Sequence, residues 1–257
     1  MQRYLLTFSY IGTAFRGLQR QVTGALPRQD DPSTVQGCLE MAIQRMQAKN
    51  MPYIVSSSRT DAGVHALSNT CHVDLESPDN EPYEPRYVTS SINKFLCKSN
   101  IPIKITSAFA VPETFHCRHN AVKRTYLYKL IVINPDVLTT HPLLQHVPIE
   151  LNERAWFPTF TEFDEESMME AAKLFLGYHD FKTFSAKDTS YFKYHGKQRL
   201  TRRTITKLSI EKSPMNLYSS YSMPTYYGFN RKVSYKSYDI YIESAGFLHN
   251  QEGPLKD

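Results

Sequence analysis

The chain has 257 residues, 41% hydrophobic and 21% charged, which excludes an intrinsically disordered protein and predicts a globular one. Its net charge of +5 fits an acidic partner such as RNA without requiring one. The sequence contains no run of 18 apolar residues, so no membrane span is predicted. The four cysteines are scattered and lack the short paired spacing of a zinc site or a disulfide framework.

The first half of the chain shows the hydrophobic periodicity of four strands and two helices. Apolar residues at helical spacing, such as Val35, Leu39 and Ile43, predict the first helix. Ser33 or Thr34 is expected to cap it, because the side-chain oxygen of either residue can accept a hydrogen bond from an unpaired backbone N–H. In chain order, we predict a strand over 3–10, a helix over 35–46, strands over 52–58 and 67–75, a helix over 85–97 and a strand over 103–111.

The second half repeats this pattern in part. We predict strands over 124–133, 202–212 and 237–247, and a helix over 165–176 that ends at Gly177. Four apolar side chains of this helix are expected to point inward: Met168, Ala172, Phe175 and Leu176. The fold class is therefore α+β, with two similar halves over 1–112 and 113–257. The second half lacks a counterpart to the last helix and strand of the first.

An insertion over about 213–237 separates the last two predicted strands and is rich in tyrosine, serine and cationic residues. Aromatic rings interleaved with cations are able to stack on bases and neutralise phosphates. The alternative, which we favour for this composition, is a solvated loop or a disordered insertion.

The stretch SSSRTDAGVHALSN places Asp61 in a polar turn between two predicted strands. Arg59 precedes it, Gly63 permits a backbone conformation that other residues resist, and His65 follows. One interpretation is an Asx-turn, in which the carboxylate bonds nearby N–H groups. The other is a reactive carboxylate held in a cleft, with a nearby cation that keeps it ionised. The turn by itself leaves both open.

Other constellations have less support. A metal site built from Asp61, His65, Cys71 and His72 matches no common ligand spacing. No serine lies on a strand–turn–helix nucleophile elbow, and no GxxxxGK[ST] or GxGxxG motif is present. A hydrolase that uses Asp61 with His65 would need a water-activating geometry that the sequence does not reveal.

The stretch SRTDAGVHA resembles the signature of the tRNA pseudouridine synthase A family. Further segments resemble that family in the same order along almost the whole chain, apart from the tyrosine-rich insertion. These segments are FSYIGTAFRGLQRQ, STVQGCLEMAI, INKFL with Asn93, FHCRHNAVKRTYLYKL, LGYHDFKTFS, RTITKLSI and GFLHNQ.

The resemblance implies an isomerase that converts uridine to pseudouridine in tRNA or another structured RNA. It implies that Asp61 is the catalytic nucleophile, or the base that starts an elimination, and that no metal or cofactor takes part. The implied fold has two ferredoxin-like (RRM-like) halves, with largely antiparallel sheets that flank a central RNA-binding cleft. A carboxylate that touches an extruded base needs a rigid turn, which accounts for the glycine beside it.

The resemblance also implies which residues bind the RNA. Arg59 is implied to occupy the space that the flipped base leaves, and Tyr126 to stack on the target uracil. Cationic side chains facing phosphates would add salt-sensitive affinity without choosing a sequence. The implied RNA-binding residues are Arg59, His65, Arg118, Lys123, Arg124, Tyr126 and Phe181.

The family continues after FLHNQ with Val-Arg, whereas this sequence has Glu252 and Gly253. The family arginine pairs with the catalytic aspartate, so without it the pKa of Asp61 is expected to rise in a low-dielectric pocket. We therefore hypothesise that this chain, as a truncated form, has little synthase activity. The alternative function is a catalytically inactive RNA-binding protein that acts in RNA folding or ribosome association.

The expected partners are tRNA or another structured RNA and, in view of the family, a second copy in a homodimer; no membrane is expected. The opening residues, MQRYLLTFSYIG, lack the apolar run and cleavage site of a secretory signal. A reducing compartment is expected, either the cytoplasm or the mitochondrion.

Overall fold

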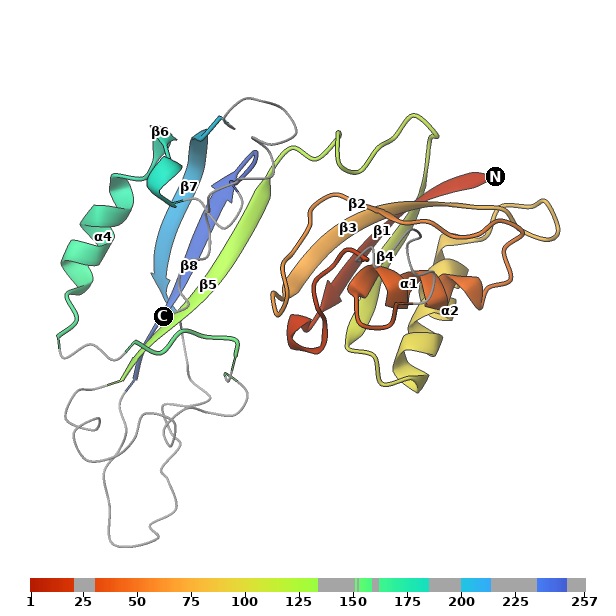
Figure 1. Cartoon of the computed structure of the whole chain (residues 1–257), viewed down its shortest axis with the longest axis horizontal. Coiled ribbons are helices and arrows are strands. Elements are labelled where there is room, and N and C mark those ends of the chain that lie inside the picture. The colour runs from red at the N-terminus through yellow and green to blue at the C-terminus, as the bar shows by residue number, and fades with distance from the viewer. Residues whose placement is uncertain are drawn as a thin grey trace, which may run out of the picture. The chain divides into compact units, whose positions relative to one another are not determined.

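The computed structural model describes residues 1–20, 31–133, 151, 153–158, 162–184, 200–213 and 235–248. Contacts divide the chain into two compact units, Met1–Ala121 and Val122–Asp257 (Figure 1). Within the described residues, each unit is α+β and has one four-stranded antiparallel sheet, which confirms the predicted fold class. The predicted domains 1–112 and 113–257 and the cleft between them stay predictions. Most of the insertion over 213–237 lies outside the described residues.

The first unit contains the six elements predicted for it, arranged as one sheet in the order β2-β3-β1-β4. The strands are β1 (Gln2–Tyr10), β2 (Val55–Ser56), β3 (Ala66–Leu75) and β4 (Ile103–Val111), and the helices are α1 (Val35–Gln44) and α2 (Pro85–Lys98). A 3₁₀ turn, η1 (Gly12–Ala14), follows β1. The predicted strand over 52–58 shortens to two residues.

The core of this unit lies between the sheet and the two helices, which cover one face of it (Figure 1). Alternate residues of β1, namely Tyr4, Leu6 and Phe8, are fully buried on that face. The apolar residues that predicted α1 are buried as well. The hydroxyl of Thr34 accepts a hydrogen bond from the Gly37 N–H at 3.2 Å, so Thr34 rather than Ser33 caps the helix.

The remaining residues of β1 point to the opposite side of the sheet, which we call the open face. It includes Arg3 and Leu5 of β1 and, opposite them in the antiparallel register, Asp74 and His72 of β3. Three of these four residues, Arg3, Asp74 and His72, are polar, in contrast to the apolar residues under the helices.

Asn93 of α2 connects the helix to β4 through two hydrogen bonds to one residue. Its amide nitrogen donates to the Ile105 carbonyl at 2.9 Å, and its amide oxygen accepts from the Ile105 N–H at 2.8 Å. The register between β1 and β4 shifts beside Ile105, between Thr7 and Phe8. Asn93 therefore supplies backbone partners where the strand ladder is irregular.

We expect Asn93→Ala to lower the free energy of unfolding by about 2–3 kcal/mol, because it leaves two backbone groups of Ile105 without these partners. Lys94→Ala, at the exposed neighbouring position, is the matched control and should change stability by less than about 0.5 kcal/mol. Urea denaturation of both variants tests this. Equal losses in the two variants would contradict the role of Asn93.

The second unit has its sheet in the order β5-β8-β7-β6. The strands are β5 (Arg124–Ile133), β6 (Gly177–Asp180), β7 (Arg202–Lys212) and β8 (Tyr235–Ser244), with one helix, α4 (Glu165–Lys173), and a 3₁₀ turn, η4 (Lys182–Phe184). Strand β6 was not predicted, and the predicted strand over 237–247 ends three residues earlier than expected.

The predicted end of the helix over 165–176 is wrong. The N–H groups of Leu174, Phe175 and Leu176 donate to carbonyls three residues back, at 3.1–3.2 Å, so the chain tightens into 3₁₀-type turns after Lys173. Phe175 and Leu176 are 36% and 40% exposed, although the Phe175 ring stacks on the buried Phe181 with centroids 6.4 Å apart. Gly177, with φ of +97°, begins β6.

Candidate active site on the Asp61 turn

Asp61 lies in the loop between β2 and β3, and its side chain is exposed. Its backbone carbonyl accepts a hydrogen bond from Val64 at 3.3 Å, and Gly63 takes a φ of +80°, the left-handed conformation that glycine tolerates. In the part of the chain that the structure describes, the Asp61 carboxylate has no hydrogen-bond or ion-pair partner. The structure therefore shows no Asx-turn at Asp61 within those residues.

The loop that follows β1 braces this turn through backbone hydrogen bonds. The Leu18 N–H donates to the Thr60 carbonyl at 3.1 Å, and the Gly63 N–H donates to the Phe15 carbonyl at 3.4 Å. Leu18 and Phe15 are both buried, so apolar packing holds the brace in place. The backbone on both sides of Asp61 is thereby fixed although its carboxylate is exposed.

Two glycines allow the brace to approach the turn closely. A Cβ at Gly12 would lie 1.9 Å from the Val64 carbonyl oxygen, which is far inside any real contact. Gly17 has φ of +118°, and a Cβ there would lie 3.1 Å from the Thr60 carbonyl oxygen. The sequence showed a glycine-punctuated loop but did not reveal that it contacts the Asp61 turn.

His65 is fixed by the same brace. Its ring Nδ1 accepts a hydrogen bond from the Gly12 N–H at 3.1 Å. In the neutral ring, the proton therefore resides on Nε2. The structure thus brings Arg59, Asp61 and His65 together on one turn, with the Arg59 side chain exposed.

Tyr10, at the end of β1, is hydrogen-bonded to the Asp61 turn. Its hydroxyl hydrogen-bonds the Thr60 hydroxyl at 2.7 Å, and burial raises the pKa of the Tyr10 phenol, while hydrogen bonds from Thr60 and Asn69 oppose the rise. The phenol is therefore neutral at physiological pH, and its contribution to the site is a hydrogen bond rather than a charge.

We expect Tyr10→Phe to lower the free energy of unfolding by about 1 kcal/mol, because the partly buried Thr60 hydroxyl loses its partner while the ring packing is kept. Thermal or urea denaturation measures this loss. Because Tyr53 is 60% exposed, Tyr53→Phe is the control and should leave stability unchanged. A Tyr10→Phe protein as stable as the wild type would show that the hydrogen bond does not support the turn.

A buried carboxylate, Glu40 of α1, connects Arg20, which follows the brace in the sequence, to the segment that leads into β2. Its oxygens contact the Arg20 guanidinium at 3.1 Å and accept from the Ile54 N–H at 3.0 Å and the Gln36 amide at 2.9 Å. Burial raises the pKa of Glu40, and these three partners oppose the rise. This network could not be predicted from the sequence, because Glu40 lies within an otherwise apolar helical pattern.

His72, on the open face of the first sheet, is also buried. Its Nδ1 accepts a hydrogen bond from the Cys117 N–H at 3.3 Å. Burial lowers the pKa of His72 below its ordinary value of 6.5, the charges of Arg3 and His116 lower it further, and Asp74 acts in the opposite direction.

The unfolded chain therefore binds a proton at this histidine at higher pH than the folded protein does. The stability contributed by neutral His72 should be complete above pH 6.5 and be lost as the pH falls below that value toward the lowered folded-state pKa. Urea denaturation from about pH 8 to about pH 5 measures the slope. His72→Asn keeps an acceptor but does not titrate, so its slope should be smaller; an unchanged slope would contradict the assignment.

The other candidate residues occupy three different settings. Arg118 is exposed on a turn of the first unit. In the second unit, the Tyr126 ring contacts Phe247 edge-on, with centroids 4.9 Å apart. Phe181 is 4% exposed and packs in the core cluster that includes Leu248, so in this structure it is a core residue of the unit.

The two cations near Tyr126 have partners within the second unit. Lys123 forms an ion pair with Glu243 at 2.8 Å, and the Arg124 guanidinium donates to the Ala245 carbonyl at 2.7 Å. Lys123 would therefore have to exchange Glu243 for a phosphate, whereas Arg124 is held at the end of β8. The RNA-binding roles of these residues stay predictions.

The four residues considered above as a metal site, Asp61, His65, Cys71 and His72, do not point to a common centre. Cys71 is buried under the helices, whereas its neighbour His72 lies on the open face. In the described residues, no three histidine, cysteine, aspartate or glutamate side chains are arranged to hold a metal ion. Among the same residues, no helix combines the length and apolar character needed to cross a bilayer. Glu252 and Gly253 lie outside the described part of the chain.

Comparison with known proteins identifies a family model and several relatives that match the sequence. A family model described as tRNA pseudouridine synthase matches residues 7–120, which include the brace and the Asp61 turn. The chain is 31% identical to mouse tRNA pseudouridine synthase-like 1 over 97% of its length, and 36% identical to tRNA pseudouridine synthase A of Agrobacterium fabrum over 72%. Human tRNA pseudouridine synthase-like 1 is 35% identical over 72%.

The matched stretches cover 76% of the mouse protein, 60% of the Agrobacterium protein and 56% of the human protein, so the chain aligns with little more than half of two of these relatives. The match to the mouse protein nevertheless spans almost all of the chain and about three quarters of that relative. The chain belongs to the tRNA pseudouridine synthase family.

Proposed function

We propose that this protein isomerises uridine to pseudouridine in tRNA, with Asp61 as the catalytic carboxylate. The glycosidic bond between ribose C1′ and uracil N1 breaks, and a bond from C1′ to uracil C5 replaces it. The C5 hydrogen leaves as a proton and N1 gains one, so the reaction needs no net oxidant or reductant. Asp61 acts as the nucleophile toward C1′ or C6, or as the base that starts an elimination.

The observation that carries this proposal is the exposed Asp61 carboxylate on an immobilised turn. A group that must reach a base extruded from its stack has to be accessible, yet its position must be fixed to a fraction of an ångström. The brace from Gly12 to Leu18 and the Tyr10–Thr60 hydrogen bond fix the backbone around Asp61 and leave its oxygens exposed. A surface aspartate with only a structural role would not need this support.

The resemblance implies supporting roles for other residues, and the chemistry of their side chains is compatible with these roles. Arg59 extends from the same turn, and a planar cation there would fill the gap that the flipped base leaves. Tyr126 has the aromatic ring that stacking on uracil requires, and it meets the Phe247 ring in a T-shaped contact. Arg118 and Arg124 would contact phosphates. A tRNA substrate places the protein in a compartment that holds tRNA, the cytoplasm or the mitochondrion.

The test is incubation of the chain with tRNA that carries tritium at uracil C5. Forming the C1′–C5 bond displaces the label, so tritium should enter the solvent with time and stop when the modified site is consumed. The same label on free uridine is the control and should be retained. A purified, folded protein that binds tRNA but releases no tritium would overturn the proposal.

That last outcome would support a second function, RNA binding without turnover. Its basis is the presence of Glu252 and Gly253 where the family has Val-Arg. The two functions share every feature of the Asp61 turn, so tRNA affinity and tritium release have to be measured separately on the same preparation. A homodimer also stays a prediction, which sedimentation analysis in solution tests.

A further inference from the structure

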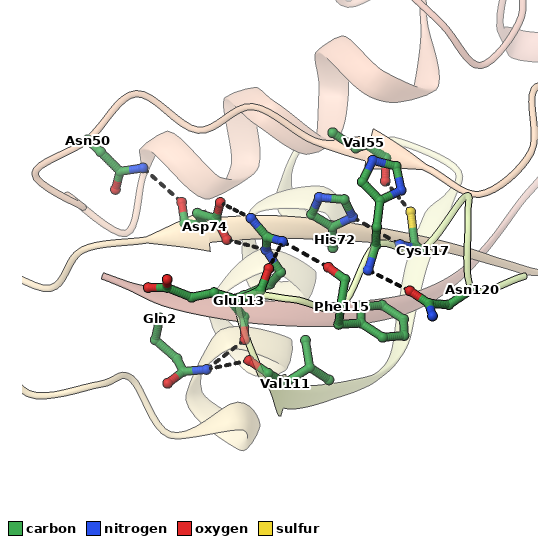
Figure 2. A network of polar contacts seen from close by, with 12 residues as sticks. Gln2, Asn50, Val55, His72, Asp74, Val111, Glu113, Phe115, Cys117 and Asn120 are labelled. Carbon is green, nitrogen blue, oxygen red and sulfur yellow. Dashed lines mark hydrogen bonds and ion pairs between the residues drawn. The ribbon is translucent and has the colours of Figure 1, made fainter.

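The segment that follows β4 lies across the open face of the first sheet, where side chains of β1 and β3 hold it. The Arg3 guanidinium forms a two-point ion pair with Asp74 at 2.7 Å and also donates to the carbonyls of Glu113 and Phe115. Figure 2 shows Glu113 and Phe115 close to Asp74 on this face. The backbone of the segment is therefore anchored before it reaches Cys117.

Cys117 is the deepest residue of this segment, 3% exposed. Its N–H donates to His72 Nδ1 at 3.3 Å, and its thiol donates to the Val55 carbonyl at 2.7 Å (Figure 2). Val55 of β2 and His72 of β3 are directly opposite each other in the strand register. Burial raises the pKa of the Cys117 thiol, which keeps the sulfur protonated and able to donate.

The residues after Cys117 form a turn that closes on itself. The His116 N–H donates to the Asn120 side-chain oxygen at 2.8 Å, and the Asn120 N–H donates to the His116 carbonyl at 2.8 Å. The ring of His116 also meets that of His72 edge-on, with centroids 4.9 Å apart. Cys117 is buried against the sheet, whereas Arg118, the next residue of the turn, is exposed.

The same pair of strands continues into the Asp61 turn. From Val55 the chain runs through β2 to Ser57, whose N–H donates to the Thr70 carbonyl of β3 at 2.9 Å, and then enters the turn. One end of this two-strand ribbon thus supports Arg118 through Cys117, and the other end supports Asp61.

We infer that His72 and Cys117 are positioning residues that hold the turn carrying Arg118 on the same two strands that lead into the Asp61 turn, so that the Arg118 guanidinium binds a backbone phosphate of tRNA. This inference rests on the proposed function. The two hydrogen bonds of Cys117 hold the base of the turn, and neither His72 nor Cys117 is expected to touch the RNA, since both are buried. Their effect on catalysis should therefore pass through Arg118.

Four variants separate positioning from general stability. His72→Leu removes the acceptor for the Cys117 N–H, whereas His72→Asn places an amide oxygen near the position of Nδ1 and should restore it. Arg118→Ala removes the phosphate contact, and the double variant His72→Leu/Arg118→Ala closes a cycle. Circular dichroism and urea denaturation first establish that each protein is folded. Hydrogen exchange of the Cys117 amide then reports directly on the hydrogen bond to His72.

We expect His72→Leu to raise the KM for tRNA about tenfold with a smaller change in kcat, because binding of a phosphate loses a well-placed charged donor. His72→Asn should recover most of this loss, and His72→Leu should have little further effect once Arg118 is alanine. The Cys117 amide should be protected from exchange in the wild type and in His72→Asn but not in His72→Leu.

A tenfold effect of His72→Leu that persists undiminished in the Arg118→Ala protein would overturn the inference, as would an unprotected Cys117 amide in the wild type. The cycle is measured on tRNA dissociation constants as well as on turnover. If the wild type binds tRNA without turnover, the catalytic proposal fails while the cycle still decides the positioning role. If no tRNA binds, the RNA-dependent part of the inference fails together with the proposed function.

Discussion

Asp61→Ala is expected to reduce tritium release from labelled tRNA by at least about a thousandfold, because it removes the only carboxylate on the turn and with it the reactive group. Asp61→Asn should have the same effect, since an amide is neither a nucleophile nor a base at neutral pH. Because the side chain is exposed, neither substitution should destabilise the fold by more than about 0.5 kcal/mol. Single-turnover assays with excess enzyme measure the loss without interference from product release.

The matched control is Asp79→Asn, which alters an acidic side chain elsewhere in the first unit and should leave turnover unchanged. The affinity for tRNA should fall little in the Asp61 variants, since phosphate contacts provide most of it. Residual turnover of one tenth or more in Asp61→Ala would mean that another group performs the chemistry.

Gly12→Ala is expected to have the second-largest effect, although position 12 carries no functional group. The added Cβ would meet the Val64 carbonyl oxygen at 1.9 Å, and a backbone atom cannot rotate away as a side chain can. Either the loop or the Asp61 turn must move. We expect a loss of about 2–3 kcal/mol in the free energy of unfolding. We also expect kcat/KM to fall at least about a hundredfold, because a displacement near 1 Å misplaces the carboxylate.

Gly63→Ala provides the comparison. A Cβ at Gly63 meets nothing within 4 Å, so only the strain of φ at +80° applies, about 1 kcal/mol. Gly12→Ala should therefore be the more damaging change in both stability and kcat/KM, although Gly63 is much nearer to Asp61 in the sequence. A Gly12→Ala protein with wild-type kcat/KM would show that the loop does not hold the turn in place.

Local patterns were sufficient to predict most of the first unit. Val88, Ile92 and Leu96 recur at helical spacing, and all three are buried on the inner face of α2. The alternation over 3–10 likewise predicted a strand, and alternate residues of β1 are buried. In these elements one face packs against a large core, so the spacing of apolar residues along the sequence matches the buried face.

Prediction failed where local pattern and final geometry diverge. The apolar run through Phe175 and Leu176 continues the helical spacing, but 3₁₀-type hydrogen bonds end the helix before these residues, and both side chains are exposed. Strand β6 has four exposed residues and no apolar alternation, so only its pairing with β7 identifies it. Both features depend on backbone hydrogen bonds that periodicity does not encode.

The candidate site divides in the same manner. Asp61 was predicted from the resemblance of SRTDAGVHA to the family signature, whose residues all lie within one short stretch of the sequence. Its supports were not found, since Gly12 and Tyr10 contact the turn across about 50 residues of sequence and the Cys117 thiol contacts Val55 over a similar distance. A single sequence gives no signal for such long-range contacts.

The most direct test of the central proposal is nucleoside analysis of tRNA after incubation with the wild-type chain and with Asp61→Asn. The proposed function predicts that pseudouridine appears in the wild-type reaction at the expense of uridine, in equal amounts, and stays absent with Asp61→Asn. Pseudouridine formed equally by both proteins would contradict the role of Asp61. Its absence from both, with tRNA binding intact, would contradict the isomerase.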